Sequence, residues 1–134
     1  MLCHIAIASE WDAAQARGRY DRSTRATSIA EVGFMHASDS YEQASRVLRY
    51  LFGDVDEPLV LLDLDAAEIA RAGLVIRHEC VSPKDPASEK FPHIYGGPLP
   101  VACARRVQRF ETADALLAVL DAGESPLPHS NSAA

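Results

Sequence analysis

Blocks of apolar and polar residues alternate along the chain, and each apolar block predicts a short strand or helix. Short apolar stretches predict strands over residues 2–8, 33–36 and 58–65, and the stretch over 101–110 also looks like a strand. A two-residue alternation predicts a further strand over 74–80, because successive side chains of a strand point to opposite faces. One face of that strand then carries Leu74, Ile76 and His78, and the other carries Val75, Arg77 and Glu79.

Helical spacing predicts four helices between these strands, over residues 10–17, 41–52, 66–72 and 113–122. Each predicted helix follows a residue suited to cap its first turn: Ser9, Ser40, Asp65 and Thr112. Strands and helices therefore alternate, with irregular connections, and this order favours an α+β fold over a doubly wound sheet. We expect one globular domain over 1–123 and a disordered tail over 124–134, which is rich in Pro and Ser.

Composition narrows the functional classes. The chain has 134 residues and a net charge of −6, which argues against broad nucleic-acid binding, since that function needs a basic face. No run of 18 apolar residues predicts a membrane span, and no secretory leader is evident, so we expect a cytoplasmic protein. The three cysteines have no CxxC spacing and predict buried, reduced thiols. The sequence does not indicate an oligomeric state.

Three histidines in strand-like stretches are the main candidates for chemistry: His4, His36 and His93. A single histidine in such a place is more often a hydrogen-bonded structural residue, but three from different strands can converge on one cleft. We expect no metal site, because HxH and HExxH pairs are absent. The nucleophile elbow GxSxG, the GxGxxG loop and the P-loop are absent too.

Two further features suggest binding groups. Glu79 ends its predicted strand on the same face as Arg77, either as an exposed ion pair or as a carboxylate at the edge of a pocket. Ser38 lies just before a helix start, where backbone N–H groups can hold a phosphate, although a simple turn residue is the alternative. An arginine-rich loop over 17–25 can either lie over such a phosphate or remain solvated.

The stretch "FPHIYGG", residues 91–97, places rings at every second position. In an extended segment Phe91, His93 and Tyr95 point to one side, and Pro92 and Ile94 to the other. We therefore expect a stiff strip of rings that forms one wall of a cleft lined by His4 and His36. Whether the rings bind a ligand or seal the core stays open at this point.

Taken in order, several motifs resemble the domain of unknown function 952 family over roughly residues 2–110. They are "LCHIA", "SIAEVGFMHAS", "LVLLDLD", "VIRHE" and "FPHIYGGPLP". The chain departs from the family in Cys3, where an aromatic residue is common, and in one extra glycine after Tyr95. The family is similar in fold to the ADP-ribosyltransferase-like superfamily, which includes the RNA 2′-phosphotransferases. The resemblance implies a split, curved β-sheet with flanking short helices and a cleft for NAD.

The resemblance also implies site residues. His4 matches the first histidine of that superfamily by position, and His36 matches the second histidine or tyrosine. For the variable third position the candidates are Glu79 and the segment from His93 to Tyr95. The expected function is a transferase acting on NAD or another nucleotide, with His4, His36 and Glu79 catalytic. Ser38, Phe91, His93 and Tyr95 would then bind the ligand. The alternative is a non-catalytic nucleotide-binding or regulatory module.

Overall fold

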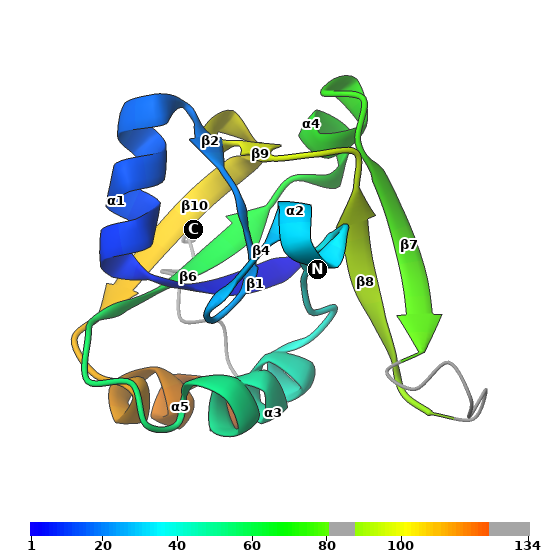
Figure 1. Ribbon diagram of the computed structural model, residues 1–134. Helices are drawn as coiled ribbons and strands as arrows, with labels where there is room; N and C mark the ends of the chain where they lie inside the picture. The colour runs from blue at the N-terminus through cyan, green and yellow to red at the C-terminus, as the bar shows by residue number, and fades with distance from the viewer. Residues whose placement is uncertain (81–87, 124–134) are drawn as a thin grey trace, which may run out of the picture.

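The computed structural model describes residues 1–80 and 88–123, and in them five α-helices are distributed among short antiparallel strands (Figure 1). The helices are α1 (Ala8–Arg17), α2 (Ile29–Val32), α3 (Tyr41–Phe52), α4 (Ala66–Arg71) and α5 (Ala113–Asp121). The strands are β1 (Cys3–Ile7), β2 (Arg19–Tyr20), β3 (Arg22–Thr24), β4 (Thr27–Ser28), β5 (Met35–His36), β6 (Leu59–Leu64), β7 (Val75–Cys80), β8 (Lys90–Tyr95), β9 (Leu99–Pro100) and β10 (Ala104–Phe110). The tail predicted over 124–134 lies outside the described residues.

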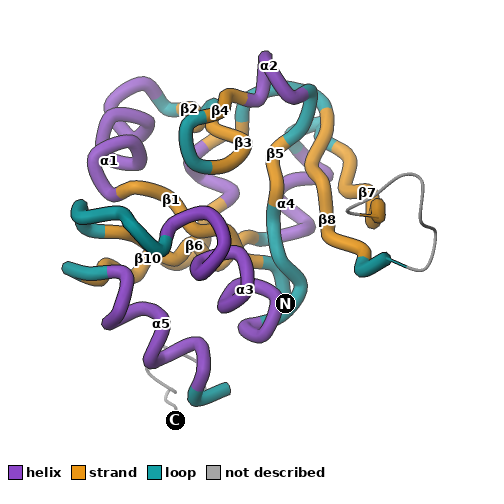
Figure 2. Tube along the Cα trace, turned by 60° about the horizontal axis from the view of Figure 1, so that its bottom comes forward, coloured by secondary structure: helices purple, strands orange, loops and turns teal. Residues whose placement is uncertain are grey.

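Two three-stranded sheets dominate the architecture, in the orders β1-β6-β10 and β5-β8-β7. All of their strand pairs are antiparallel. The expected α+β class is confirmed, and the helices lie beside and between the sheets rather than in regular crossovers (Figures 1 and 2). The stretch over 91–95, expected only to be extended, forms most of β8, the central strand of the second sheet.

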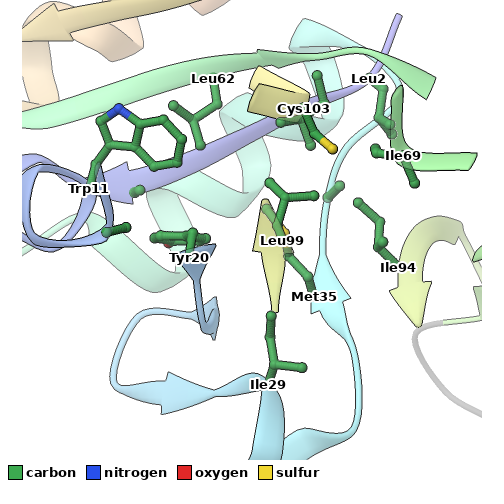
Figure 3. Packing of buried hydrophobic residues seen from close by; sticks show 14 of the residues in the cluster. Leu2, Trp11, Tyr20, Ile29, Met35, Leu62, Ile69, Ile94, Leu99 and Cys103 are labelled. Atoms are coloured by element: carbon green, nitrogen blue, oxygen red, sulfur yellow. The ribbon is translucent and has the colours of Figure 1, made fainter. Parts of the chain in front are cut away.

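The β1-β6-β10 sheet separates two apolar clusters because its side chains alternate between its faces. Ile5 and Leu61 face α3 and α5, whereas Ala6 and Leu62 face the other cluster. This second cluster includes Trp11 of α1 and extends to the inner face of the β5-β8-β7 sheet (Figure 3). Since both faces of β6 are covered, the run "LVLLDL" is apolar almost throughout.

Three of the four predicted helix caps are confirmed. The side chains of Ser40, Asp65 and Thr112 each accept a hydrogen bond from a backbone N–H in the first turn of their helix. The Ser9 cap is wrong, because α1 begins at Ala8, two residues before its predicted start, and Ser9 lies inside the helix. The N–H of Ala8 donates to the Pro58 carbonyl, so the helix starts against the strand connection without a side-chain cap.

The connection over 17–33, one of those expected to be irregular, contains β2, β3, β4 and α2. Tertiary contacts order this segment. Tyr20 pairs with Leu99 of β9 and is buried against Trp11. Ser28 and Glu31 form a reciprocal capping box at the start of α2. No helix among the described residues has the length and apolar character that a membrane span requires.

Candidate functional site

One face of the β5-β8-β7 sheet gathers most of the residues singled out from the sequence. The register sets His36 and Arg77 on either side of His93, and Glu79 opposite Phe91. Directly paired residues point to the same face of an antiparallel sheet. The predicted alternation of "FPHIY" is therefore confirmed, while Ile94 on the other face packs into the core.

Five aromatic and imidazole rings form a continuous strip on this face. In spatial order they are Phe91, His36, His93, Phe34 and Tyr95, and we call them the ring strip. Successive ring centroids lie 4.9, 5.4, 3.9 and 5.4 Å apart. Phe34 and His93 are stacked, with an interplanar angle of 18°. The strip thus crosses between β8 and the segment that leads into β5, and its rings hold one another in place.

Glu79 is bound to the strip by two hydrogen bonds at one oxygen. Its Oε1 accepts from Nδ1 of His93 at 2.8 Å and from the Tyr95 hydroxyl at 2.5 Å. These two hydrogen bonds lower the pKa of Glu79 and keep it ionised, and the bond to Glu79 raises the pKa of Tyr95. Among the described residues, Oε2 of Glu79 has no hydrogen-bond partner and remains able to accept from a ligand.

The imidazole of His36 is neutral, and both of its ring nitrogens are available to a ligand. Burial, together with the neighbouring His93, lowers the pKa of His36 from its ordinary value of 6.5 to about 4. No described residue forms a hydrogen bond with either of its ring nitrogens, although its backbone carbonyl accepts one from His4. A neutral imidazole can donate at one nitrogen and accept at the other, so His36 can bind a group that offers both.

His4 lies beneath His36 and does not reach the open face. It is 4% exposed. Its Nδ1 donates to the His36 carbonyl at 2.6 Å, and its Nε2 accepts from the Tyr20 hydroxyl at 2.9 Å. The tautomer follows from the carbonyl, which can only accept. Burial lowers the pKa of His4 to about 4, which keeps it neutral. Both nitrogens are occupied, so His4 in this arrangement fixes the position of β5 and has no free nitrogen for a ligand.

Ser38 joins the two sheets instead of presenting its backbone to a phosphate. Its N–H donates to the Cys3 carbonyl at 2.8 Å, and its carbonyl accepts from Cys3 at 2.9 Å. In this arrangement the N–H of Ser38 is used within the protein and is not free to donate to a phosphate. The Ser38 side chain borders a cavity of only ≈ 10 Å³ next to His4 and His36, about the space of one water molecule.

The arginine-rich loop borders the site through Thr24, which lines the small cavity beside His36 and Ser38, whereas three of its arginines pair with carboxylates. Arg17 pairs with Asp21, and Arg22 pairs with Glu10. Arg25 donates to the Leu51 carbonyl at the end of α3 and forms an ion pair with Asp54. Glu10 and Asp54 join the loop to two other segments, whereas Asp21 belongs to the loop itself.

Two open cavities adjoin the ring strip. The hairpin cavity, ≈ 360 Å³, is bordered by Gly73, Val75, Arg77, Glu79, Tyr95 and Gly96. The α3 cavity, ≈ 350 Å³, is bordered by His36, Arg46, Val47, Tyr50, Leu51, Glu89 and Phe91. Both volumes fall in the range of small-molecule sites. Gly96 has φ 123°, and an added Cβ would lie 2.7 Å from Cδ2 of Leu74, so the turn beside the hairpin cavity requires glycine.

Sequence reasoning missed two residues of this arrangement. Tyr20 lies between charged residues in a polar segment, and no periodicity marks it as the partner of His4. Phe34 did have a signal, since it precedes His36 by two residues and an extended chain puts both on one face. No group of three or more His, Cys, Asp or Glu side chains suited to a metal ion occurs within residues 1–80 and 88–123.

Comparison with known proteins places the chain among relatives of known structure. A family model described as "Protein of unknown function (DUF952)" matches residues 5–107. The crystal structure of protein CC0527 from Caulobacter crescentus is 27% identical, with a TM-score of 0.61 over 87% of this chain and 97% of that one. The solution NMR structure of CC0527 is 28% identical, with a TM-score of 0.61 over 90% and 94% of the two chains. A search of curated proteins yields no match.

Proposed function

Since the chain belongs to the DUF952 family, whose description names no activity, we propose a function from the site: the protein binds a nucleotide or NAD-like small molecule along the ring strip. The observation that carries this proposal is the imidazole of His36. It is a partly buried polar ring without a hydrogen-bond partner among the described residues, and it borders an open cavity of ligand size. A neutral imidazole at the border of a cavity can donate at one nitrogen and accept at the other, so such a ring is a natural contact for a ligand.

The ligand class follows from the chemistry on this face. The α3 cavity offers the apolar surfaces of Val47, Leu51 and Phe91, which suit a planar heteroaromatic ring. Beside the hairpin cavity, Oε2 of Glu79 can accept from sugar hydroxyls, and Arg77 can donate to a phosphate. A nucleotide combines these three groups in one molecule.

The ADP-ribosyltransferase-like fold expected from the family resemblance supports a more specific proposal. Two split three-stranded sheets, with His4 on the first strand of one and His36 on a strand of the other, agree with that expectation. In this proposal NAD is the substrate: its nicotinamide leaves with the bonding electron pair, while an oxygen nucleophile, either water or the hydroxyl of an acceptor molecule, bonds to the ribose carbon and releases its proton to solvent. The ionised Glu79 stabilises the positive charge that develops on the ribose. His36 and Tyr95 orient the substrate, and His4 positions His36.

Ligand titration tests the binding proposal. NAD, ADP-ribose and AMP are titrated into ¹⁵N-labelled protein and followed by NMR. We expect shifts at His36 and Tyr95, and a loss of affinity of about tenfold or more in His36→Ala, the usual effect of one lost hydrogen bond. His78→Ala is the matched control, because His78 belongs to the same sheet but points to the opposite face. Equal affinities of the two variants, or no binding by the wild type, would contradict the proposal.

A non-catalytic nucleotide-binding module is the second candidate, and the burial of His4 favours it. A histidine with both nitrogens occupied gives the ligand no direct contact from that position. Chromatographic detection of released nicotinamide distinguishes the two candidates. Turnover that disappears in Glu79→Gln supports the enzyme, whereas saturable binding without release supports the module.

A further inference from the structure

Strand β7 forms an uncovered edge of the second sheet. It pairs with β8 on one side, and no described strand or helix lies along its other side (Figures 1 and 2). Half of the backbone N–H and C=O groups of an edge strand point away from the sheet and can pair with a further strand. Proteins usually block such an edge with charged side chains, so the order of the charges on β7 decides whether this edge is blocked.

The charges of β7 are complementary to a second copy of β7. In a two-fold symmetric antiparallel pair, one residue must lie opposite its own copy. If Arg77 or Glu79 lies on the axis, like charges face each other. If His78 lies on the axis, each Arg77 faces a Glu79 of the other copy. Because the strand runs over Val75–Cys80, this register also keeps most of its length paired.

Both charged groups have unused bonding capacity. Arg77 has no salt bridge with any described residue, and its guanidinium carbon lies 5.6 Å from the centroid of the Tyr95 ring. Glu79 uses only Oε1 within the described chain, so Oε2 can accept from an arginine. The side chain of Glu79 is 40% exposed, which leaves it within reach of a partner.

We propose that the protein self-associates through antiparallel pairing of β7 with β7 of a second copy, with His78 on the two-fold axis. Arg77 then pairs with the partner's Glu79, and Glu79 pairs with the partner's Arg77. Directly opposed residues share a face, so both ion pairs lie on the face of the ring strip. The partner's Arg77 thereby joins the border of the hairpin cavity beside Glu79. The site of one copy is completed by a residue of the other.

Sedimentation equilibrium over about 1 µM to 1 mM, the range of weak specific association, tests this pairing without any ligand. We expect a monomer–dimer equilibrium in the wild type in the absence of any nucleotide. Arg77→Glu places like charges opposite each other twice and is expected to weaken dimerisation by more than about tenfold. Arg106→Glu is the matched control, because it makes the same charge change on an exposed position of the edge strand β10.

A mixing experiment gives the sharpest test of the register. Arg77→Glu and Glu79→Arg are each expected to be monomeric alone, whereas their equimolar mixture restores two opposite-charge pairs and is expected to dimerise. Circular dichroism first verifies that each variant is folded. Should Glu79→Arg fail to fold, the comparison of Arg77→Glu with Arg106→Glu decides alone. A wild type that is monomeric throughout, or equal weakening by the two arginine variants, overturns the proposal and leaves the nucleotide proposal unaffected.

Discussion

Acidification is expected to destabilise the protein through His4, which is buried, and His36, which is partly buried. Burial lowers the pKa of His4 and of His36 from 6.5 to about 4, so both are neutral in the folded state. In the unfolded chain they bind protons as the pH falls below about 6.5. The free energy of unfolding is therefore highest above pH 6.5 and decreases as the pH falls toward 4. At pH 5, about 1.5 pH units below 6.5, each histidine has lowered the free energy of unfolding by about 2 kcal/mol.

The two histidines together remove about 4 kcal/mol by pH 5, a large part of the stability of an ordinary domain. Urea denaturation at pH 7.5, 6.5, 5.5 and about 5 measures this loss, with the fluorescence of the buried Trp11 as the signal. Stopping near pH 5 keeps most carboxylates of the unfolded chain ionised. His36→Gln removes one of the two groups and is expected to halve the loss. An unfolding free energy that stays constant or rises from pH 7.5 to 5 would refute this reasoning.

Two other substitutions test particular contacts by chemical denaturation. Tyr20→Phe leaves Nε2 of His4 buried without a donor and is expected to cost about 1–3 kcal/mol, whereas Tyr50→Phe, at a side chain that is 90% exposed, is expected to change stability by less than about 0.5 kcal/mol. Equal effects would contradict the importance of the buried bond. Gly96→Ala is expected to destabilise more than Gly97→Ala, because both residues have φ 123° but only at position 96 does an added Cβ meet a side-chain atom, at 2.7 Å. The reverse order would show that the turn relaxes freely.

The sequence predicts the elements whose signals are local. The three confirmed caps, Ser40, Asp65 and Thr112, act within a single helical turn, and the alternation of Phe91 to Tyr95 needs only an extended backbone. The same alternation placed Glu79 and the rings on faces that the register then brought together. Local periodicity was sufficient there because the two strands are neighbours in the sheet.

Long-range contacts account for what the sequence did not predict. Tyr20 lies in a polar segment and is buried because β9 pairs with β2 from far along the chain. The arginines of the same segment are neutralised by carboxylates in other elements, which no local pattern indicates. His4 was expected at a ligand, but its hydrogen bond to His36 depends on how the two sheets meet. Such contacts depend on tertiary packing, which overrides local preference.

The connection between the sheets has a consequence for hydrogen exchange. Within the described chain, two sets of hydrogen bonds join the two three-stranded sheets: the backbone bonds between Cys3 and Ser38, and the bond from His4 to His36. Neither sheet needs these bonds to pair its own strands. Amides at this junction can therefore exchange by a local opening that leaves both ladders intact. The apolar cluster that both sheets share still couples them across this boundary, so the opening is local. Since His36 lies on that boundary, a ligand bound to it would slow exchange at Cys3 and Ser38 as well as at its own site.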